Sequence, residues 1–202
     1  TDEVREKIQQ NCSEMRIPLQ MYRTAVFDSA GNSGKNPCFL CSRLRRGWLY
    51  KKASELGCNK IALGHHFDDV VETILMGMLY GSQMQTMLPK LHSENYSGME
   101  LIRPLYLVRE ERIIQWQMEN ELDFTRCACS IAENSDQGTK RKEIKLLLRQ
   151  LRKNNPSVDM NIFRSAENVN LRKIISYHDG DRYHSFLDDY HEGISVKGTR
   201  NT

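Results

Sequence analysis

A short apolar segment between two helical patterns restricts the fold of this chain more than any other feature. Residues 59–64, NKIALG, predict a strand, and 65–81 predict a helix with one apolar face. A preceding helix is predicted over 38–57, because Pro37 suits a first helical turn and Gly57 ends the pattern. Strands that alternate with helices indicate a parallel sheet with crossover helices. We therefore expect an α/β fold.

Less periodic segments complete the expected organisation. The other helical patterns and extended runs cover 1–16, 17–26, 101–108, 110–122 and 139–153. From about residue 176 the chain is polar and aromatic without a clear period, which is typical of a loosely ordered tail or a lid. We therefore expect a main domain over 1–175 and a tail or lid over 176–202.

The composition fits a soluble globular protein. Of the 202 residues, 39% are hydrophobic and 27% are charged, which excludes a collagen, a coiled-coil rod and a wholly disordered chain. Uncharged apolar runs fall far short of the roughly 18 to 20 residues that a membrane span needs. No secretion leader opens the chain, so we expect a cytoplasmic protein without a membrane partner.

Basic residues gather in two segments, 43–52 and 140–153, although the net charge is only +3. A solvated helix face explains either cluster alone. Two such clusters in one chain of this size favour a phosphate-rich partner.

The end of the predicted central strand carries the first candidate site. Ligands of open α/β sheets lie outside the carboxyl ends of the strands, where this sequence places Gly64, His65 and His66. Gly64 has no side chain and lets a ligand approach the backbone. Adjacent side chains on an extended segment point in opposite directions, so at most one of the two histidines faces the ligand.

Two carboxylates follow at the start of the next helix. Asp68 or Asp69 is suited to cap this helix, because both lie at its positive end. Alternatively, one of them holds Mg²⁺ bound to nucleotide phosphates. Glu72 lies one turn further, where it could share the metal or brace the turn.

Six cysteines are present without a sign of the secretory context that disulfides need. Cys38 and Cys41 have the spacing of a metal or redox pair, at a helix start that stabilises thiolates. The short run before Cys127 could return this residue to the same crevice. Three cysteines leave one metal position open, as a catalytic iron–sulfur cluster needs, whereas Cys129 would complete a structural zinc site. The Cys-Ala-Cys spacing is an awkward chelate for one zinc, which favours the cluster.

Three of these features occur together in one known family. The run PCFLCSRLRRGWLYKKASELGCNKIALGHHFDDVVETILMGMLYG (37–81), then IRPLYLV, then a cysteine before a basic helix resembles the tRNA 2-thiocytidine synthetases. These enzymes belong to the N-type ATP pyrophosphatase superfamily. The resemblance covers roughly residues 15–170.

The resemblance implies an adenine nucleotide alpha-hydrolase-like, Rossmann-like fold that uses ATP, Mg²⁺ and a 4Fe-4S cluster. It implies catalytic roles for Asp69, Cys38 and Cys41. The implied cluster ligands are Cys38, Cys41 and Cys127, and the implied ATP-binding positions are Gly64, His65, Asp69 and Arg45.

The implied reaction is ATP-dependent tRNA thiolation. The oxygen on carbon 2 of a cytidine is adenylated and pyrophosphate leaves. A sulfide on the open iron then attacks this carbon, and AMP departs. The family also implies a homodimer, while the sequence does not identify the sulfur donor.

One family motif does not occur in this sequence. The nucleotide loop Ser-Gly-Gly-x-Asp-Ser is absent, so we expect a longer native chain with at least one more strand–helix–strand unit, on the order of 30 residues. We do not expect ATP turnover from the present residues alone.

Other functions remain open on the sequence. A tRNA 2-thiouridine synthetase of the same superfamily is the nearest alternative, although such enzymes usually carry extra zinc-binding cysteine pairs near their termini, and this chain has none. A zinc-stapled RNA-binding domain without enzymatic activity, in which Zn²⁺ replaces the cluster, and a sulfur-transfer enzyme for small molecules are further alternatives.

Overall fold

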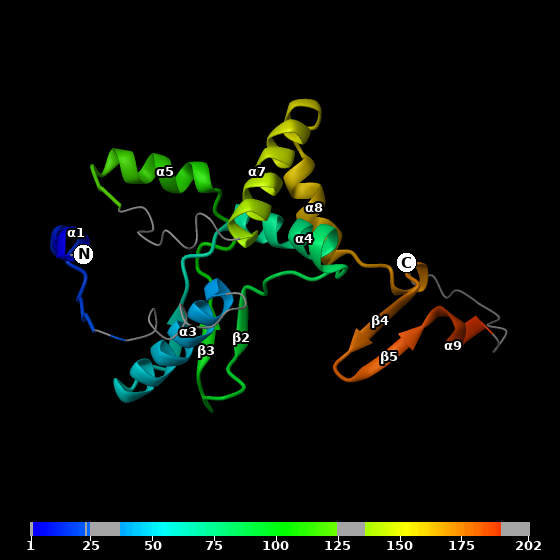
Figure 1. Cartoon of the computed structure of the whole chain (residues 1–202), viewed down its shortest axis with the longest axis horizontal. Helices are drawn as coiled ribbons and strands as arrows, with labels where there is room; N and C mark the ends of the chain where they lie inside the picture. Colours follow the sequence, from blue (N-terminus) through cyan, green and yellow to red (C-terminus); the bar gives the residue numbers. More distant parts are fainter. Residues whose placement is uncertain (1, 23, 25–36, 125–135, 191–202) are drawn as a thin grey trace, which may run out of the picture. The chain divides into compact units, whose positions relative to one another are not determined.

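The computed structural model describes residues 2–22, 24, 37–124 and 136–190, without the side chains of 37–39, 136–139 and 189. It has an α/β architecture with a small central sheet (Figure 1). Within these residues the chain forms two compact units, 1–163 and 164–202. None of the described helices is long and apolar enough to cross a membrane.

The central sheet has the strand order β1-β3-β2, from β1 (Lys60–Ala62), β2 (Lys90–His92) and β3 (Glu100–Ile102). Strands β1 and β3 are parallel, with Ile61 opposite Leu101. Strands β2 and β3 are antiparallel. The prediction of a parallel sheet is therefore wrong in part, because the sheet is mixed.

The short connection between β2 and β3 explains this difference. Residues 93–99 are too few for the helical crossover that parallel neighbours need. The connection turns at Gly98, whose φ of 75° lies in the left-handed region that glycine adopts at no steric cost. The sequence between 82 and 100 has no apolar alternation, so this hairpin is not predicted.

The predicted helices of the first unit are present, with bounds that differ by a few residues. They are α1 (Asp2–Glu14), α3 (Pro37–Glu55), α4 (Phe67–Gly81), α5 (Glu110–Glu119) and α7 (Asp136–Asn154). A further helix, α8 (Val158–Glu167), is not predicted. The extended run 101–108 forms a strand only to Ile102, because Pro104 cannot donate to a sheet and the chain turns there. In the run 17–26, the described residues pair with no strand.

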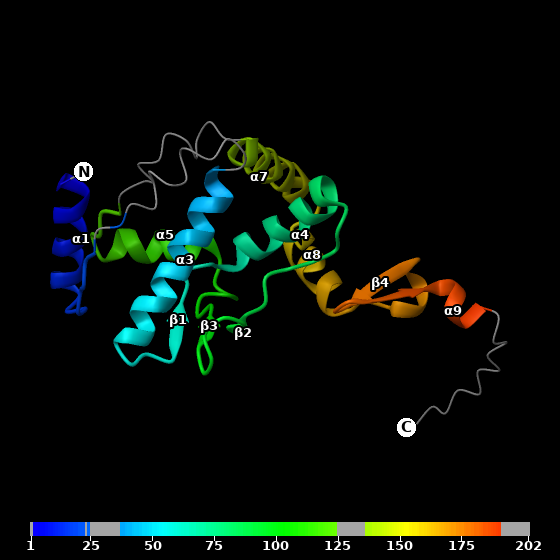
Figure 2. The same cartoon turned by 60° about the horizontal axis from the view of Figure 1, so that its bottom comes forward.

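Helix α3 covers the sheet and forms one apolar cluster with it (Figures 1 and 2). Tyr50 packs with Ile61 of β1 and Leu101 of β3, and all three are buried. The ring of Tyr50 stacks on that of Tyr96, with 5.3 Å between the centroids. The amino-terminal half of α3 therefore extends past the carboxyl end of β1.

Helix α4 forms a second apolar cluster with α7 and the first residues of α8. Its buried members are Phe67, Val70, Val71, Ile74, Ile144, Leu148 and Phe163. The predicted apolar face of α4 is buried only in its first two turns, since Met78 is 49% exposed and Leu79 is 56% exposed. Helices α4 and α7 contact each other, and Arg141 and Arg152 of α7 pair with the aspartates in the first turn of α4.

The second unit contains a β-hairpin that the sequence pattern does not predict. Strands β4 (Ser176–Asp179) and β5 (Arg182–Ser185) are antiparallel, after a short 3₁₀ helix η1 (Leu171–Lys173) and before α9 (Phe186–Tyr190). Tyr177 stacks on His184 across the two strands, with 4.6 Å between the ring centroids. The function of these residues as a lid stays a prediction.

Candidate active site at the end of strand β1

The candidate site is formed by the loop that joins β1 to α4. The backbone N–H of Leu63 donates to the carbonyl of Ile102 (2.9 Å), and that of Phe67 donates to the carbonyl of Val108 (2.9 Å). The loop between these anchors holds Gly64, which is exposed. A Cβ atom on Gly64 would meet nothing within 4 Å. The space beside this backbone is therefore open.

Asp69 both caps α4 and faces a cation. Its Oδ2 accepts a hydrogen bond from the backbone N–H of His66 (3.1 Å), while its Oδ1 lies 3.0 Å from Nη1 of Arg141. Nε2 of His66 lies 3.4 Å from the same Oδ2. The capping and the functional interpretations of this carboxylate are thus compatible, because its two oxygens have different partners.

Asp68 has a different environment, although it is the adjacent residue. It is buried, and its Oδ2 accepts a hydrogen bond from the backbone N–H of Glu110 at the start of α5 (2.8 Å). Its Oδ1 pairs with Nη2 of Arg152 (3.0 Å). Because the first N–H groups of a helix have no partner within the helix, Asp68 stabilises the start of α5.

Arg152 links Asp68 to a second buried carboxylate. Asp159 is 1% exposed, and both its oxygens accept hydrogen bonds from Arg152, at 2.8 and 3.0 Å. Nη1 of Arg109 donates to the same side chain (3.0 Å), and the Arg109 guanidinium lies over the ring of Phe67. The hydrogen bond with Asp159 raises the pKa of Arg152.

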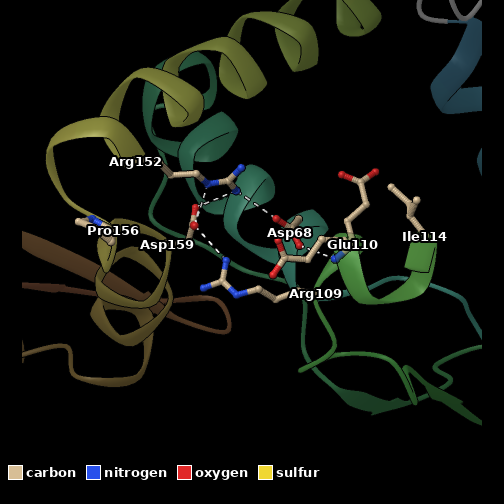
Figure 3. Close-up of a pocket in the computed structure, with 8 residues that line it drawn as sticks. Asp68, Arg109, Glu110, Ile114, Arg152, Pro156 and Asp159 are labelled. Atoms are coloured by element: carbon tan, nitrogen blue, oxygen red, sulfur yellow. Dashed lines mark hydrogen bonds and ion pairs between the residues drawn. The ribbon is translucent and has the colours of Figure 1, made fainter. Parts of the chain in front are cut away.

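These charged side chains border a cavity of about 450 Å³ (Figure 3). Its lining residues are Asp68, Arg109, Glu110, Glu111, Ile114, Arg152, Pro156 and Asp159. Figure 3 shows that the two arginines reach Asp159 and that Arg152 also reaches Asp68. Every buried carboxylate here has a cationic partner, so we interpret the network as structural.

Glu72 is a deeply buried acid that lies next to Asp69 in the site. Its side chain is 3% exposed, with Nζ of Lys145 3.6 Å from Oε1 and Nη1 of Arg141 3.4 Å from Oε2. Burial raises the pKa of Glu72, although both cations act in the opposite direction. Oε2 has no hydrogen bond within the described part of the chain.

The position of Arg141 bears on the predicted Mg²⁺. One nitrogen of this residue lies between an oxygen of Asp69 and an oxygen of Glu72, a place that suits a cation. Mg²⁺ usually binds one or two carboxylates together with phosphate oxygens. The two carboxylates therefore fit a Mg²⁺ ion bound to nucleotide phosphates.

His65 is half-buried and lies between Gly64 and His66 in this loop. Its Nδ1 is buried and has no hydrogen bond among the described residues. Burial lowers the pKa of His65. The charge of Asp69 acts in the opposite direction, and three arginines lower the pKa further: Arg103, Arg141 and Arg46. The imidazole is therefore neutral near pH 7, when it can both donate and accept one hydrogen bond.

The structure describes only part of the predicted cysteine site. Cys38 and Cys41 are three residues apart on α3, which places them on the same side of the helix. Cys41 is a free, half-buried thiol. The side chain of Cys38 and the whole of Cys127 lie outside the described residues. The role of these cysteines as cluster ligands therefore stays a prediction.

The sequence does not predict the inward contacts of the basic helix. Arg141, Lys145 and Arg152 form ion pairs with carboxylates of α4, α5 and α8. The spacing of the three residues could have predicted these contacts, because they lie on the same side of α7 as the buried residues Ile144 and Leu148. Arg45, predicted to contact phosphate, is exposed on α3.

Comparison with known proteins supports this description. The model of the PP-loop domain family matches residues 1–151. Three relatives are named tRNA-cytidine(32) 2-sulfurtransferase. The relative from Coxiella burnetii is 41% identical over 72% of this chain, and that from Geobacter sulfurreducens is 39% identical over 70%. The relative from Verminephrobacter eiseniae is 43% identical over 67%. The matches cover 55%, 54% and 42% of the relatives, so the chain spans about half their length.

A solved structure has the same fold. It is the U34-tRNA thiolase NcsA from Methanococcus maripaludis with its [4Fe-4S] cluster, at a TM-score of 0.65 and 22% identity. The match covers 82% of this chain and 55% of that one. Both the sequence match and the fold confirm the predicted superfamily. This chain belongs to the PP-loop domain family.

Proposed function

We propose that the chain is the site-bearing part of an ATP-dependent tRNA sulfurtransferase that replaces the oxygen on carbon 2 of a cytidine with sulfur. The observation that carries this proposal is the identity of about two residues in five with tRNA-cytidine(32) 2-sulfurtransferases. The position of Gly64, His65 and Asp69 at one end of β1 supports it, because this end is where α/β sheets bind nucleotides.

In this proposal, the loop after β1 binds ATP. Gly64 provides the open backbone against which the nucleotide lies, and His65 offers a neutral imidazole. Asp69, together with Glu72, would hold Mg²⁺ on the phosphates, which offsets their charge as the adenylate forms. Arg141 would then leave its place between the two carboxylates and be free to contact a phosphate oxygen.

Cys38, Cys41 and Cys127 would hold the iron–sulfur cluster, which would supply the sulfide. The pair on α3 provides two thiolates from one helical turn. ATP activates the base: the cytosine oxygen attacks the α-phosphorus, and pyrophosphate leaves. Sulfide then bonds to carbon 2 while AMP leaves with the former oxygen, so a poor leaving group has become a good one.

The test is the tRNA product. Full-length protein purified without oxygen is incubated with ATP, sulfide and unmodified tRNA, and the nucleosides of the tRNA are analysed by mass spectrometry. We expect 2-thiocytidine. Asp69→Asn should lower its yield by about 100-fold or more. Arg112→Gln, on the exposed side of α5, is the control and should keep the yield. Unmodified tRNA that carries no thiolated nucleoside after the incubation would contradict the proposal.

A second candidate is thiolation of uridine. The solved thiolase of the same fold acts on U34 of tRNA, which makes this the alternative that a specific observation favours. The same nucleoside analysis separates the two, because 2-thiouridine would replace 2-thiocytidine. Binding of tRNA by a protein that contains zinc and transfers no sulfur would instead favour the RNA-binding domain.

A further inference from the structure

Arg103 is a buried cation at the end of β3. It is 8% exposed, and its backbone is held on both sides: its N–H donates to the carbonyl of Pro89 (2.8 Å), and its carbonyl accepts from the N–H of Tyr106 (3.1 Å). Its side chain donates to the carbonyl of Leu88 through Nη1. The guanidinium is therefore fixed in place rather than free to move into solvent.

No anion neutralises this guanidinium within the described part of the chain. Its Nε is buried without a hydrogen bond, and Arg103 forms no ion pair with a carboxylate of the described residues. Elsewhere the same fold pairs its partly buried arginines, as Arg109 and Arg152 pair with Asp159. A buried charge without a partner is strongly unfavourable, so the contrast needs an explanation.

The nearest charges make this environment more positive. Arg46 lies on α3 one turn before Tyr50, and Tyr50 packs with Leu101, two residues before Arg103. Burial lowers the pKa of Arg103, and the charge of Arg46 lowers it further. Both arginines also act on His65. Arg103 and His65 thus follow the carboxyl ends of β3 and β1, and Arg46 lies on the helix that packs on these strands. Neither guanidinium has a carboxylate partner among the described residues.

We propose that Arg103 and Arg46 bind a phosphate group at the carboxyl ends of β1 and β3. A phosphate would satisfy the free Nε of Arg103 and remove the repulsion between the two guanidiniums, which are well shaped for such an anion. Gly64, whose backbone is open, follows Leu63, and Leu63 donates its N–H to the carbonyl of Ile102, the residue before Arg103. The phosphate belongs either to a nucleotide or to the RNA backbone. These two sources follow from the proposed function, whereas the anion site itself does not depend on it.

The test measures binding of inorganic pyrophosphate to the 202-residue chain by calorimetry at constant ionic strength. We expect Arg46→Gln and Arg103→Gln to weaken pyrophosphate binding at least about tenfold, because each removes a charge-assisted contact. Arg112→Gln removes the same charge from an exposed site on α5 and should change the affinity less than about twofold. Arg46 is exposed, so its variant tests the site even where Arg103→Gln does not fold.

Binding of unmodified tRNA to the same variants distinguishes the two sources of phosphate. Loss of pyrophosphate binding with unchanged tRNA binding supports a nucleotide phosphate. Loss of tRNA binding in both arginine variants, with Arg112→Gln unchanged, supports an RNA phosphate. If Arg46→Gln binds both ligands as the unchanged chain does, the anion site is overturned. None of these measurements involves sulfur transfer, so failure of the proposed enzyme activity would leave their outcome readable.

Discussion

Asp68 and Asp69 show how two adjacent and identical residues acquire different functions. Asp68 points to the interior, where it pairs with Arg152 and caps α5, whereas Asp69 lies at the surface of the candidate site with Arg141. From the residue pattern, capping of the helix and binding of Mg²⁺ are alternatives for this pair. Only the family resemblance selects Asp69, because the partners that separate the two side chains lie about 40 to 84 residues further along the chain.

The two aspartates should therefore respond differently to the same substitution. We expect Asp68→Asn to lower the free energy of unfolding by about 3 kcal/mol, because it leaves Arg152 short of one charge partner and weakens the cap of α5. Asp69→Asn keeps an acceptor for the His66 N–H and should cost only about 1 kcal/mol. Urea denaturation measures both. Equal losses of stability would contradict the division of roles.

Gly64 and Gly77 form a second matched pair. A Cβ at Gly64 meets nothing within 4 Å, while one at Gly77 would lie 2.8 Å from the carbonyl oxygen of Gln83. Gly77→Ala should therefore destabilise the fold by about 1 to 3 kcal/mol. Gly64→Ala should leave the stability unchanged. It should weaken nucleotide binding, because the added methyl group would separate the nucleotide from the backbone. Thermal unfolding and ATP titration together check this; unaltered ATP affinity in Gly64→Ala would contradict it.

The buried imidazole of His65 gives a pH dependence. Its pKa is lowered in the folded state, so below the usual value of about 6.5 the unfolded chain binds more protons than the folded chain. Its contribution to stability is therefore complete above about pH 6.5 and is lost as the pH falls towards the lower folded pKa. His65→Gln should flatten the curve of unfolding free energy against pH in this acidic range. Replacement of the exposed His92 is the control, and an equal flattening there would refute the assignment.

At the scale of elements, the helices of the first unit are predicted well and the sheet is not. Amphipathic spacing, Pro37 and Gly57 determine α3 and α4 locally, so the sequence shows them. Strands of three residues carry too few positions for an alternating pattern, and the direction of β2 depends on the length of its connection to β3. Contacts between elements distant in sequence are likewise absent from local patterns, which is why the inward ion pairs of α7 are not predicted.

Helix α7 consequently has two kinds of basic residue. Arg152 holds two buried carboxylates, whereas Arg149 on the same helix is exposed. We expect Arg152→Met to destabilise the protein by about 3 to 5 kcal/mol, because Asp68 and Asp159 would keep uncompensated buried charge. Arg149→Met should stay within about 0.5 kcal/mol of the unchanged chain. Chemical denaturation tests the contrast, and similar values for the two variants would show that the network carries no stability.

At the scale of the whole molecule, the account joins a nucleotide site to a cysteine site within one family of proteins. The chain spans about half the length of its tRNA-cytidine(32) 2-sulfurtransferase relatives, and it contains the strand end, the acidic pair and the paired cysteines that the proposed reaction needs. Its central claim is that the three cysteines bind an iron–sulfur cluster beside the ATP site rather than a zinc ion.

The most direct test is the metal content of the 202-residue chain purified without oxygen. Iron and acid-labile sulfide are measured together with zinc, and we expect about four iron and four sulfide per chain. Cys38→Ala and Cys127→Ala should lose both, while replacement of the exposed Cys58 should not. Zinc without iron, in protein never exposed to air, would contradict the account and favour a structural metal in an RNA-binding domain.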